Sequence, residues 1–282
     1  MKGEYRVGVV IPAKNEERFI EQVVLTLPKF VDLAVIINDG STDSTREILE
    51  KVDPAVEMHC IHLEGEGVGF AIDTGHKYLL EHWGNEKFIS VVMAGDGQMN
   101  PSEMELLLEP LLQNKAEHSK GDRFAHQKGL KSMPPLRRRA SRVLSFFTGL
   151  ASGQTIPDPQ CGYTATHSDV LREWNWGDSW RGYGYPNFWL IRLSTMGCRI
   201  AHVPVEAIYG EEKSGIRRLS FVVKVGLMMA YRHHHRNFSW IFSNKLTPHT
   251  LFAGIAYAIG WMALLPGIST CLLYTSPSPR DH

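Results

Sequence analysis

The feature that most constrains the fold is an alternation of short apolar runs with segments of helical periodicity along the first part of the chain. The apolar runs are strand-sized and lie at Val7–Ile11, Leu33–Ile37, Val56–Leu63 and Phe88–Met93. Between them, apolar residues recur at the three- and four-residue spacing of an amphipathic helix. Strands that alternate with helices predict an α/β fold with a mostly parallel sheet flanked by helices on both faces.

Two helix starts in this region carry the pattern of a capping box, in which a Ser is followed by a Glu three residues later. Ser44 with Glu47 is expected to open the helix after the second strand, and Ser102 with Glu105 the helix after the fourth. In each, the Ser side chain would satisfy a backbone N–H group of the first helical turn.

Polar residues follow three of the four runs, where each predicted strand ends. Glu16 follows the first run, Asp39 the second, and Asp96 with Gln98 the fourth. Ligands of open α/β sheets bind beyond the carboxyl ends of the strands. If the strand order is 3-2-1-4, these three loops line one crevice, which is the expected nucleotide site.

Composition argues against several classes of protein. The 282-residue chain is 43% hydrophobic, enough for one catalytic domain with an appendage, and its 30 basic and 30 acidic residues give no global charge that would attract nucleic acid. The cysteines are widely spaced and form no CxxC pair, which argues against a zinc ribbon or a disulfide scaffold: Cys60, Cys161, Cys198 and Cys271.

The C-terminal part has the pattern of a membrane attachment. Residues 250–274 contain no charged side chain and are long enough to span a bilayer as a helix, although a buried pair of core helices is the alternative. Residues 213–245 hold seven Lys or Arg and no acid among many aromatic residues, which is typical of amphipathic helices at a membrane interface. The basic flank places this side in the cytosol. His233–His235 are interpreted as interfacial, because successive helical residues point in different directions.

The residue types at the strand ends suit phosphate chemistry. Asp96 and Gln98 offer oxygen ligands for Mg²⁺ or Mn²⁺, and the alternative is a turn whose Asp caps the next helix. Asp39 suits a base or a ribose, or else a simple Asx turn. Residues 115–142 hold nine Lys or Arg against two acids, which is either a solvated face or a phosphate-binding region.

An ordered set of motifs resembles a known family. The chain is similar to the inverting family 2 glycosyltransferases of the GT-A fold, and within them to the dolichyl- and polyprenyl-phosphate sugar synthases. The resemblance covers roughly residues 5–215. The motifs that carry it are IPAKNE, INDGSTDST, GEGVGFAIDTG, MAGDGQMNP, GDRF and DPQCGYTA.

This resemblance implies a donor site. The residues that it places at the nucleoside are Pro12, Ala13 and Glu16, with Asp39 at the base. It places Asp96 and Gln98 at the metal ion and the diphosphate, Arg123 at a phosphate, and Lys213 in a loop that closes over the donor phosphates. The chain departs from the family at Ala94, where a carboxylate usually stands, which implies weaker metal binding.

The resemblance also implies an acceptor site, since in the family an Arg four residues before a Ser holds the lipid phosphate. That pair maps to Arg137 and Ser141. A phosphate acceptor is ionised at neutral pH and attacks without a general base. A hydroxyl acceptor needs one, for which Asp178 is the best candidate, although its aromatic surroundings favour packing.

The sequence therefore predicts an enzyme that moves a sugar from a nucleotide-diphosphate sugar to a polyprenyl phosphate at the cytosolic face of a membrane. The alternatives are the same fold with a glycan or lipid hydroxyl acceptor, a non-catalytic nucleotide-sugar-binding relative, and a nucleotidyltransferase. The expected regions are a GT-A domain at 5–212, interfacial helices at 213–245, a transmembrane helix at 248–274 and an unstructured tail at 275–282, for which a non-native origin is one reading.

Overall fold

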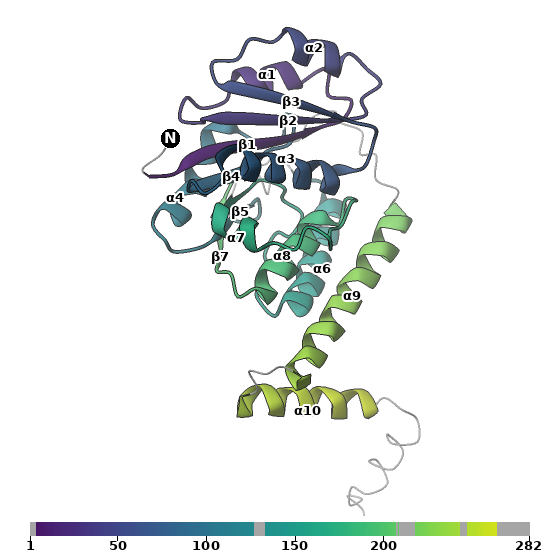
Figure 1. Ribbon diagram of the computed structural model, residues 1–282. Coiled ribbons are helices and arrows are strands. Elements are labelled where there is room, and N and C mark those ends of the chain that lie inside the picture. The colour runs from purple at the N-terminus through teal and green to yellow at the C-terminus, as the bar shows by residue number, and fades with distance from the viewer. Residues whose placement is uncertain (1–3, 127–132, 207, 209–217, 243–246, 264–282) are drawn as a thin grey trace, which may run out of the picture. The chain divides into compact units, whose positions relative to one another are not determined.

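The computed structural model describes residues 4–126, 133–206, 208, 218–242 and 247–263, and these contain a seven-stranded sheet in the order β3-β2-β1-β4-β6-β5-β7 (Figure 1). Six of these strands run in one direction and β6 runs against them. The prediction of a mostly parallel sheet, with its first four strands in the order 3-2-1-4, is confirmed. The strands are β1 (Arg6–Ala13), β2 (Leu33–Asp39), β3 (Glu57–Leu63), β4 (Phe88–Val92), β5 (His118–Asp122), β6 (Thr164–His167) and β7 (Ile200–Pro204).

Helices cover both faces of this sheet. Successive residues of β1 face opposite sides of the sheet and belong to two hydrophobic cores. Val9 lies in the core that includes residues of α1, α2 and α4, and Val10 lies in the core that includes residues of α3, α7 and α8. Strands buried on both faces need continuous apolar runs, which is why the sequence marks them clearly. The described helices are α1 (Ile20–Leu25), α2 (Thr45–Lys51), α3 (Val68–Trp83), the 3₁₀ helix η1 (Pro101–Glu103), α4 (Met104–Leu112), α6 (Pro135–Ser152), α7 (Ser168–Glu173), α8 (Tyr185–Thr195), α9 (Arg218–Phe242) and α10 (Pro248–Met262).

Both predicted capping boxes are wrong, because a neighbouring residue takes the role in each case. Before α2, the Ser44 side chain makes no capping bond, and Asp43 Oδ1 accepts from the backbone N–H of Thr45 at 3.1 Å. Before η1, Asn100 Oδ1 accepts from the N–H of Ser102 at 3.1 Å. Asp and Asn side chains commonly accept from the N–H two residues further along, as both do here.

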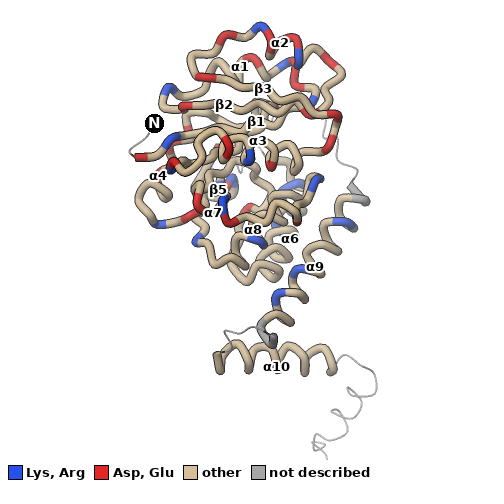
Figure 2. The backbone as a smooth tube through the Cα atoms, viewed as in Figure 1, with Lys and Arg blue, Asp and Glu red and all other residues tan. Residues whose placement is uncertain are grey.

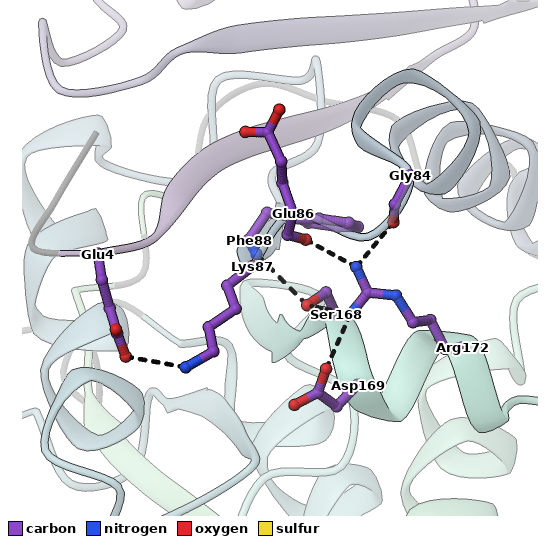
Figure 3. Close-up of polar contacts among 8 residues, drawn as sticks. All are labelled: Glu4, Gly84, Glu86, Lys87, Phe88, Ser168, Asp169 and Arg172. Carbon is purple, nitrogen blue, oxygen red and sulfur yellow. Dashed lines mark hydrogen bonds and ion pairs between the residues drawn. The ribbon is translucent and has the colours of Figure 1, made fainter.

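At the amino end of β4, Arg172 of α7 fastens the turn that joins α3 to this strand (Figure 3). Its Nη2 donates to the carbonyl oxygens of Gly84 at 2.8 Å and Glu86 at 2.7 Å. Its Nη1 donates to Ser168 Oγ at 2.9 Å, and that oxygen also accepts from the N–H of Phe88 at 3.3 Å. This arginine therefore has a structural role at the end of the sheet opposite the predicted crevice.

The chain separates into two compact units, Met1–Met229 and Ala230–His282. In the second unit, His234 is hydrogen-bonded to Tyr257, and Thr247 caps α10 through the N–H of Thr250. Lys and Arg follow one another along α9 without an acidic residue (Figure 2).

The membrane prediction is tested only in part. In the ranges that the structure describes, none of the helices has both the length and the apolar character to cross a bilayer. Of the predicted span at 248–274, α10 covers 248–262, whereas 264–274 and the tail at 275–282 lie outside the described residues.

Candidate active site at the carboxyl edge of the sheet

The loops that follow β1, β2 and β4 meet at one edge of the sheet, as their adjacent strands require. The N–H of Glu16, after β1, donates to Thr45 Oγ1 after β2 at 2.8 Å. The N–H of Gly95, after β4, donates to the carbonyl oxygen of Pro12 at 3.1 Å. Pro12 and Ala13 are buried, and Glu16 is half-buried. The structure therefore brings together the three loops that the sequence assigned to the nucleotide.

The loop after β1 is held in a strained backbone conformation by the loop after β2. Asn15 has φ of 59°, in the left-handed region that non-glycine residues rarely adopt. Its Oδ1 accepts from the N–H of Thr42 at 2.8 Å, and its own N–H donates to Ser41 Oγ at 2.9 Å. These bonds offset the cost of that conformation and fix the backbone next to Glu16.

Asp39 holds the glycine-bearing loop after β3. Its Oδ1 accepts from the N–H of Glu66 at 2.7 Å, and its Oδ2 accepts from the N–H of Gly67 at 2.9 Å. The side chain is buried, with 4% of its surface exposed. Asp39 thus orders the edge of the crevice, and contact with a base stays a prediction.

The glycines of this loop allow close contact with the segment before α8. A Cβ at Gly69 would lie 1.8 Å from the carbonyl oxygen of Trp180, and one at Gly67 would lie 2.5 Å from that of Arg181. The N–H of Gly69 donates to the Arg181 carbonyl at 2.9 Å, and the Arg181 side chain pairs with Glu66 at 2.7 Å. These glycines are therefore explained by chain packing, without a phosphate.

Asp96 stands in a tight turn just beyond β4. Gly97 has φ of 71°, and Asp96 Oδ1 accepts from the N–H of Gln98 at 3.0 Å. Burial raises the pKa of the Asp96 carboxyl above its ordinary value, and the Gln98 bond and the charge of Arg137 act against this rise. A desolvated carboxylate of this kind gains from a nearby cation.

Arg137 and Ser141 lie one turn apart near the start of α6. Arg137 is exposed and close enough for its charge to act on Asp96, whereas Ser141 is 4% exposed. The charge of the predicted acceptor arginine thus acts on the predicted metal ligand, although 41 residues separate them in the sequence.

Arg123 lies in a buried ion pair that the sequence did not reveal. Its Nε donates to Asp158 Oδ2 at 2.7 Å, and its Nη2 donates to Asp158 Oδ1 at 2.9 Å. Although burial alone raises the pKa of Asp158, the bonds and charge of Arg123 outweigh it and hold the pKa below its ordinary value. This geometry makes Arg123 a residue that positions the DPQCG loop, and its contact with a phosphate stays a prediction.

Lys120 is a second buried cation that holds the same loop. It is fully buried in β5, its Nζ donates to the carbonyl oxygen of Cys161, and burial lowers its pKa. The solvated-face interpretation of residues 115–142 is therefore wrong for Lys120 and Arg123. The sequence signal that could have revealed these roles is the DPQCG motif, because Asp158 needs a cationic partner once it is buried.

Asp178 and Lys213 are the two remaining predicted residues. Asp178 Oδ2 accepts from Arg192 Nη1 at 2.9 Å, so the candidate general base is held in an ion pair. Lys213 lies outside the described residues. Among the residues that are described, no group of three or more His, Cys, Asp or Glu side chains is placed to hold a metal ion.

Comparison with known proteins agrees with this architecture. Residues 8–174 match the family model described as glycosyl transferase family 2. An uncharacterised protein of Methanocaldococcus jannaschii is 30% identical over 207 residues, which cover 73% of this chain and 82% of that protein. A UDP-N-acetylglucosamine–dolichyl-phosphate N-acetylglucosaminyltransferase of Methanococcus voltae is 28% identical over 220 residues, with coverage of 73% and 86%.

A solved structure shares the fold. Glucosyl-3-phosphoglycerate synthase from Mycobacterium tuberculosis, crystallised with Mn²⁺, UDP and phosphoglyceric acid, gives a TM-score of 0.61 at 20% identity and covers 81% of this chain and 78% of its own. The family model spans more than half of the chain and includes the loops after β1, β2 and β4. The chain therefore belongs to glycosyl transferase family 2, and it is a glycosyltransferase with a GT-A-like α/β fold.

Proposed function

We propose that the protein moves a sugar from a nucleoside-diphosphate sugar to a polyprenyl phosphate of the dolichyl type, with inversion at the anomeric carbon. The observation that carries the proposal is the convergence of three polar loops at the carboxyl edge of the sheet, where the half-buried Asp96 follows β4 and is acted on by the charge of Arg137 on α6. Asp96 suits a cation at the leaving diphosphate, and Arg137 suits the acceptor phosphate.

Two comparisons support the donor and the acceptor classes. The name of the Methanococcus voltae relative states a UDP-sugar donor and a dolichyl phosphate acceptor. The Mycobacterium tuberculosis structure, which shares the fold, holds UDP and Mn²⁺. For this chain, a nucleoside-diphosphate sugar is the donor that the loops after β1, β2 and β4 would hold.

A divalent cation fits the residues at the end of β4. Asp96 and Gln98 would hold Mg²⁺ or Mn²⁺ through oxygen ligands, and the raised pKa of Asp96 reflects a burial cost that a cation would offset. When bound, the cation would neutralise the charge that develops on the departing diphosphate. Because Ala94 offers no carboxylate, diphosphate oxygens and water would complete the coordination.

The acceptor needs orientation more than activation. A phosphate monoester is already anionic at neutral pH, so it can attack the anomeric carbon without losing a proton to a base. Arg137 would hold this phosphate in line with the sugar, with Ser141 behind it on the same side of α6. Asp178, the candidate base for a hydroxyl acceptor, is paired with Arg192, which fits an attack that needs no base.

Membrane attachment is part of the proposal. The cations of α9 would lie near lipid phosphates, and residues 248–274 would anchor the chain. The excess of Lys and Arg before that segment favours a catalytic domain on the cytosolic side.

Transfer of label to lipid tests the proposed function. Membranes that contain the protein would receive a panel of labelled nucleotide sugars with a polyprenyl phosphate, and the extracted lipid would be analysed. We expect one sugar to label the lipid, and both a chelator and Asp96→Ala to abolish the labelling. Asp53→Ala, at an exposed aspartate in the loop after α2, is the matched control. Label in a glycan instead of the lipid phosphate, or release of pyrophosphate, would reject the proposal.

A further inference from the structure

Helix α6 exposes large apolar side chains and buries small, mostly polar ones. Leu136 is 67% exposed and Phe146 is 63% exposed. A helix at a protein surface in water normally shows the reverse arrangement. The buried residues of α6 are Ser141, Thr148, Ala151 and Ser152. Its exposed large apolar residues are Leu136, Val143, Phe146, Phe147 and Leu150.

These exposed residues lie on one side of the helix, here named the α6 apolar face. With 3.6 residues per turn, their five positions fall within an arc of about 100° around the helix axis. From Leu136 to Leu150 the face extends about 21 Å along the helix at 1.5 Å per residue. An apolar stripe of about this width is characteristic of an amphipathic helix, and helices of this kind can lie in a membrane interface.

The opposite side of α6 is fixed against α8, its neighbour in the fold (Figure 1), so the apolar face cannot turn inward. Asn187 of α8, which is fully buried, donates from Nδ2 to Thr148 Oγ1 at 2.7 Å. Asn187 also accepts a hydrogen bond from Gln160. Rotating α6 would leave these buried polar groups without partners.

The charges on α6 identify the occupant of this face. The helix carries Arg137, Arg138, Arg139 and Arg142 and contains no acidic residue. By the same helical geometry, Arg142 projects beside one margin of the apolar face, and the exposed Arg139 projects within its arc. A face of exposed phenylalanines with arginines at its margin and near its start is complementary to acyl chains beneath anionic head groups.

We propose that the α6 apolar face docks on an anionic lipid bilayer, into which Phe146 and Phe147 insert. Where it concerns the substrate, this inference rests on the proposed function. With α6 on the bilayer, Arg137 at the start of the helix would hold a lipid phosphate at the membrane surface, and the lipid would reach the sugar without leaving its bilayer. The docking itself needs no catalysis.

A probe at the face reports docking directly, independently of α9 and α10. An environment-sensitive fluorophore would be attached at Phe146→Cys in the full chain, with Leu25→Cys as the control, because Leu25 is 51% exposed on α1. The background would carry serine at Cys60, Cys198 and Cys271. With vesicles of phosphatidylcholine and phosphatidylglycerol, we expect the probe at 146 to be quenched by lipid-borne quenchers and the probe at 25 to stay in water.

Substitutions give the size of the effect. Phe146→Gln with Phe147→Gln should weaken vesicle binding roughly tenfold or more. Arg139→Gln and Arg142→Gln should each weaken binding roughly fivefold, and only to vesicles that contain phosphatidylglycerol. Leu25→Gln should leave binding unchanged.

Three outcomes would overturn the inference. The first is that the chain does not bind the vesicles, and the second is that it binds while the probe at 146 stays in water. The third is a probe shift that depends on protein concentration in the absence of lipid, because this would assign the face to a second copy of the chain. Quenching at 146 without sugar transfer to any acceptor would reject the proposed function and leave docking standing. Sugar transfer to lipid while the probe at 146 stays in water would reject docking and leave the proposed function standing.

Discussion

At the residue scale, Arg123 shows how surroundings decide what a charged side chain does. In the sequence it is one of nine cations between residues 115 and 142. In the structure it is 7% exposed and forms a bidentate pair with Asp158, whose surface is fully covered. Two carboxylate oxygens and the planar guanidinium match in geometry, so the pair fixes the loop that runs into β6.

Breaking this pair should destabilise the protein strongly. Asp158→Asn would leave the Arg123 cation buried without its counter-charge, which typically costs about 3–5 kcal/mol. Urea denaturation should therefore show a lower free energy of unfolding, whereas Asp169→Asn should lose less than about 1 kcal/mol, because that carboxylate is 78% exposed beside Arg172. Equal losses in the free energy of unfolding for the two variants would show that the buried pair stabilises the fold no more than the exposed pair does.

The same pair should also change how the free energy of unfolding depends on pH in acid. Because Arg123 holds the pKa of Asp158 below its ordinary value of 3.8, the stabilisation is complete above that pH and is lost as the pH falls below it. The free energy of unfolding of Asp158→Asn, already lower at neutral pH, should therefore decline less steeply in strong acid than that of the natural protein.

At the scale of elements, the sequence reveals strands and loops whose signals are local. Strands β1 to β4 are apolar runs buried on both faces, and their order follows from the βαβ pattern, so the convergence of Glu16, Asp39 and Asp96 could be inferred. Strand β5 could not, because its sequence HSKGD contains no apolar run. Its burial depends on distant partners, such as the bond of 2.9 Å between His118 and Thr166 of β6.

The failures at the site have the same physical origin. The capping boxes were wrong because several side chains near a helix start compete for the same N–H groups, and the outcome depends on local geometry. The roles of Lys120 and Arg123 depend on Asp158 and Cys161, which are at least 35 residues away in the sequence. No spacing rule links such partners.

Helix α3 gives a prediction about pH, through His76. Its ring is buried, contacts Ser90 Oγ of β4 at 2.9 Å and stacks on Trp189 of α8 with 5.4 Å between ring centroids. Burial lowers the pKa of His76 to about 3, from an ordinary value of 6.5. The folded state therefore keeps the ring neutral, while the unfolded chain binds a proton below pH 6.5. This stabilisation is complete above pH 6.5 and is lost as the pH falls towards 3.

Urea unfolding at several pH values between 7 and 5 measures this effect. One such histidine contributes about 1.4 kcal/mol per pH unit below its unfolded pKa. The slope for His76→Gln should be smaller by that amount but not zero, because burial also lowers the pKa of His118. His59→Gln, at an exposed ring on β3, should keep the slope of the natural protein. An unchanged slope in His76→Gln would mean that His76 is protonated in the folded state.

At the scale of the whole molecule, the proposed reaction has to join a water-soluble donor to a lipid acceptor. The loops after β1, β2 and β4 form the edge where the donor would lie, and the charge of Arg137 on α6 acts on Asp96 at that edge. The same helix carries the α6 apolar face. In the proposed reaction, this one helix would connect the nucleotide site with the membrane.

Arg137 can be tested apart from membrane binding with a short-chain polyprenyl phosphate in solution. Removing a hydrogen-bonding charge from a bound phosphate typically costs 1.5–3 kcal/mol, so Arg137→Gln should lower kcat/KM for the acceptor roughly ten- to hundredfold. The KM for the nucleotide sugar should not change, because Arg137 is assigned to the acceptor. Arg138→Gln, at the next residue of α6, should keep both parameters with this soluble acceptor. If Arg137→Gln weakened donor binding and spared the acceptor, the phosphate that Arg137 meets would belong to the donor diphosphate beside Asp96, and the acceptor site would have to be sought elsewhere on the same edge of the sheet.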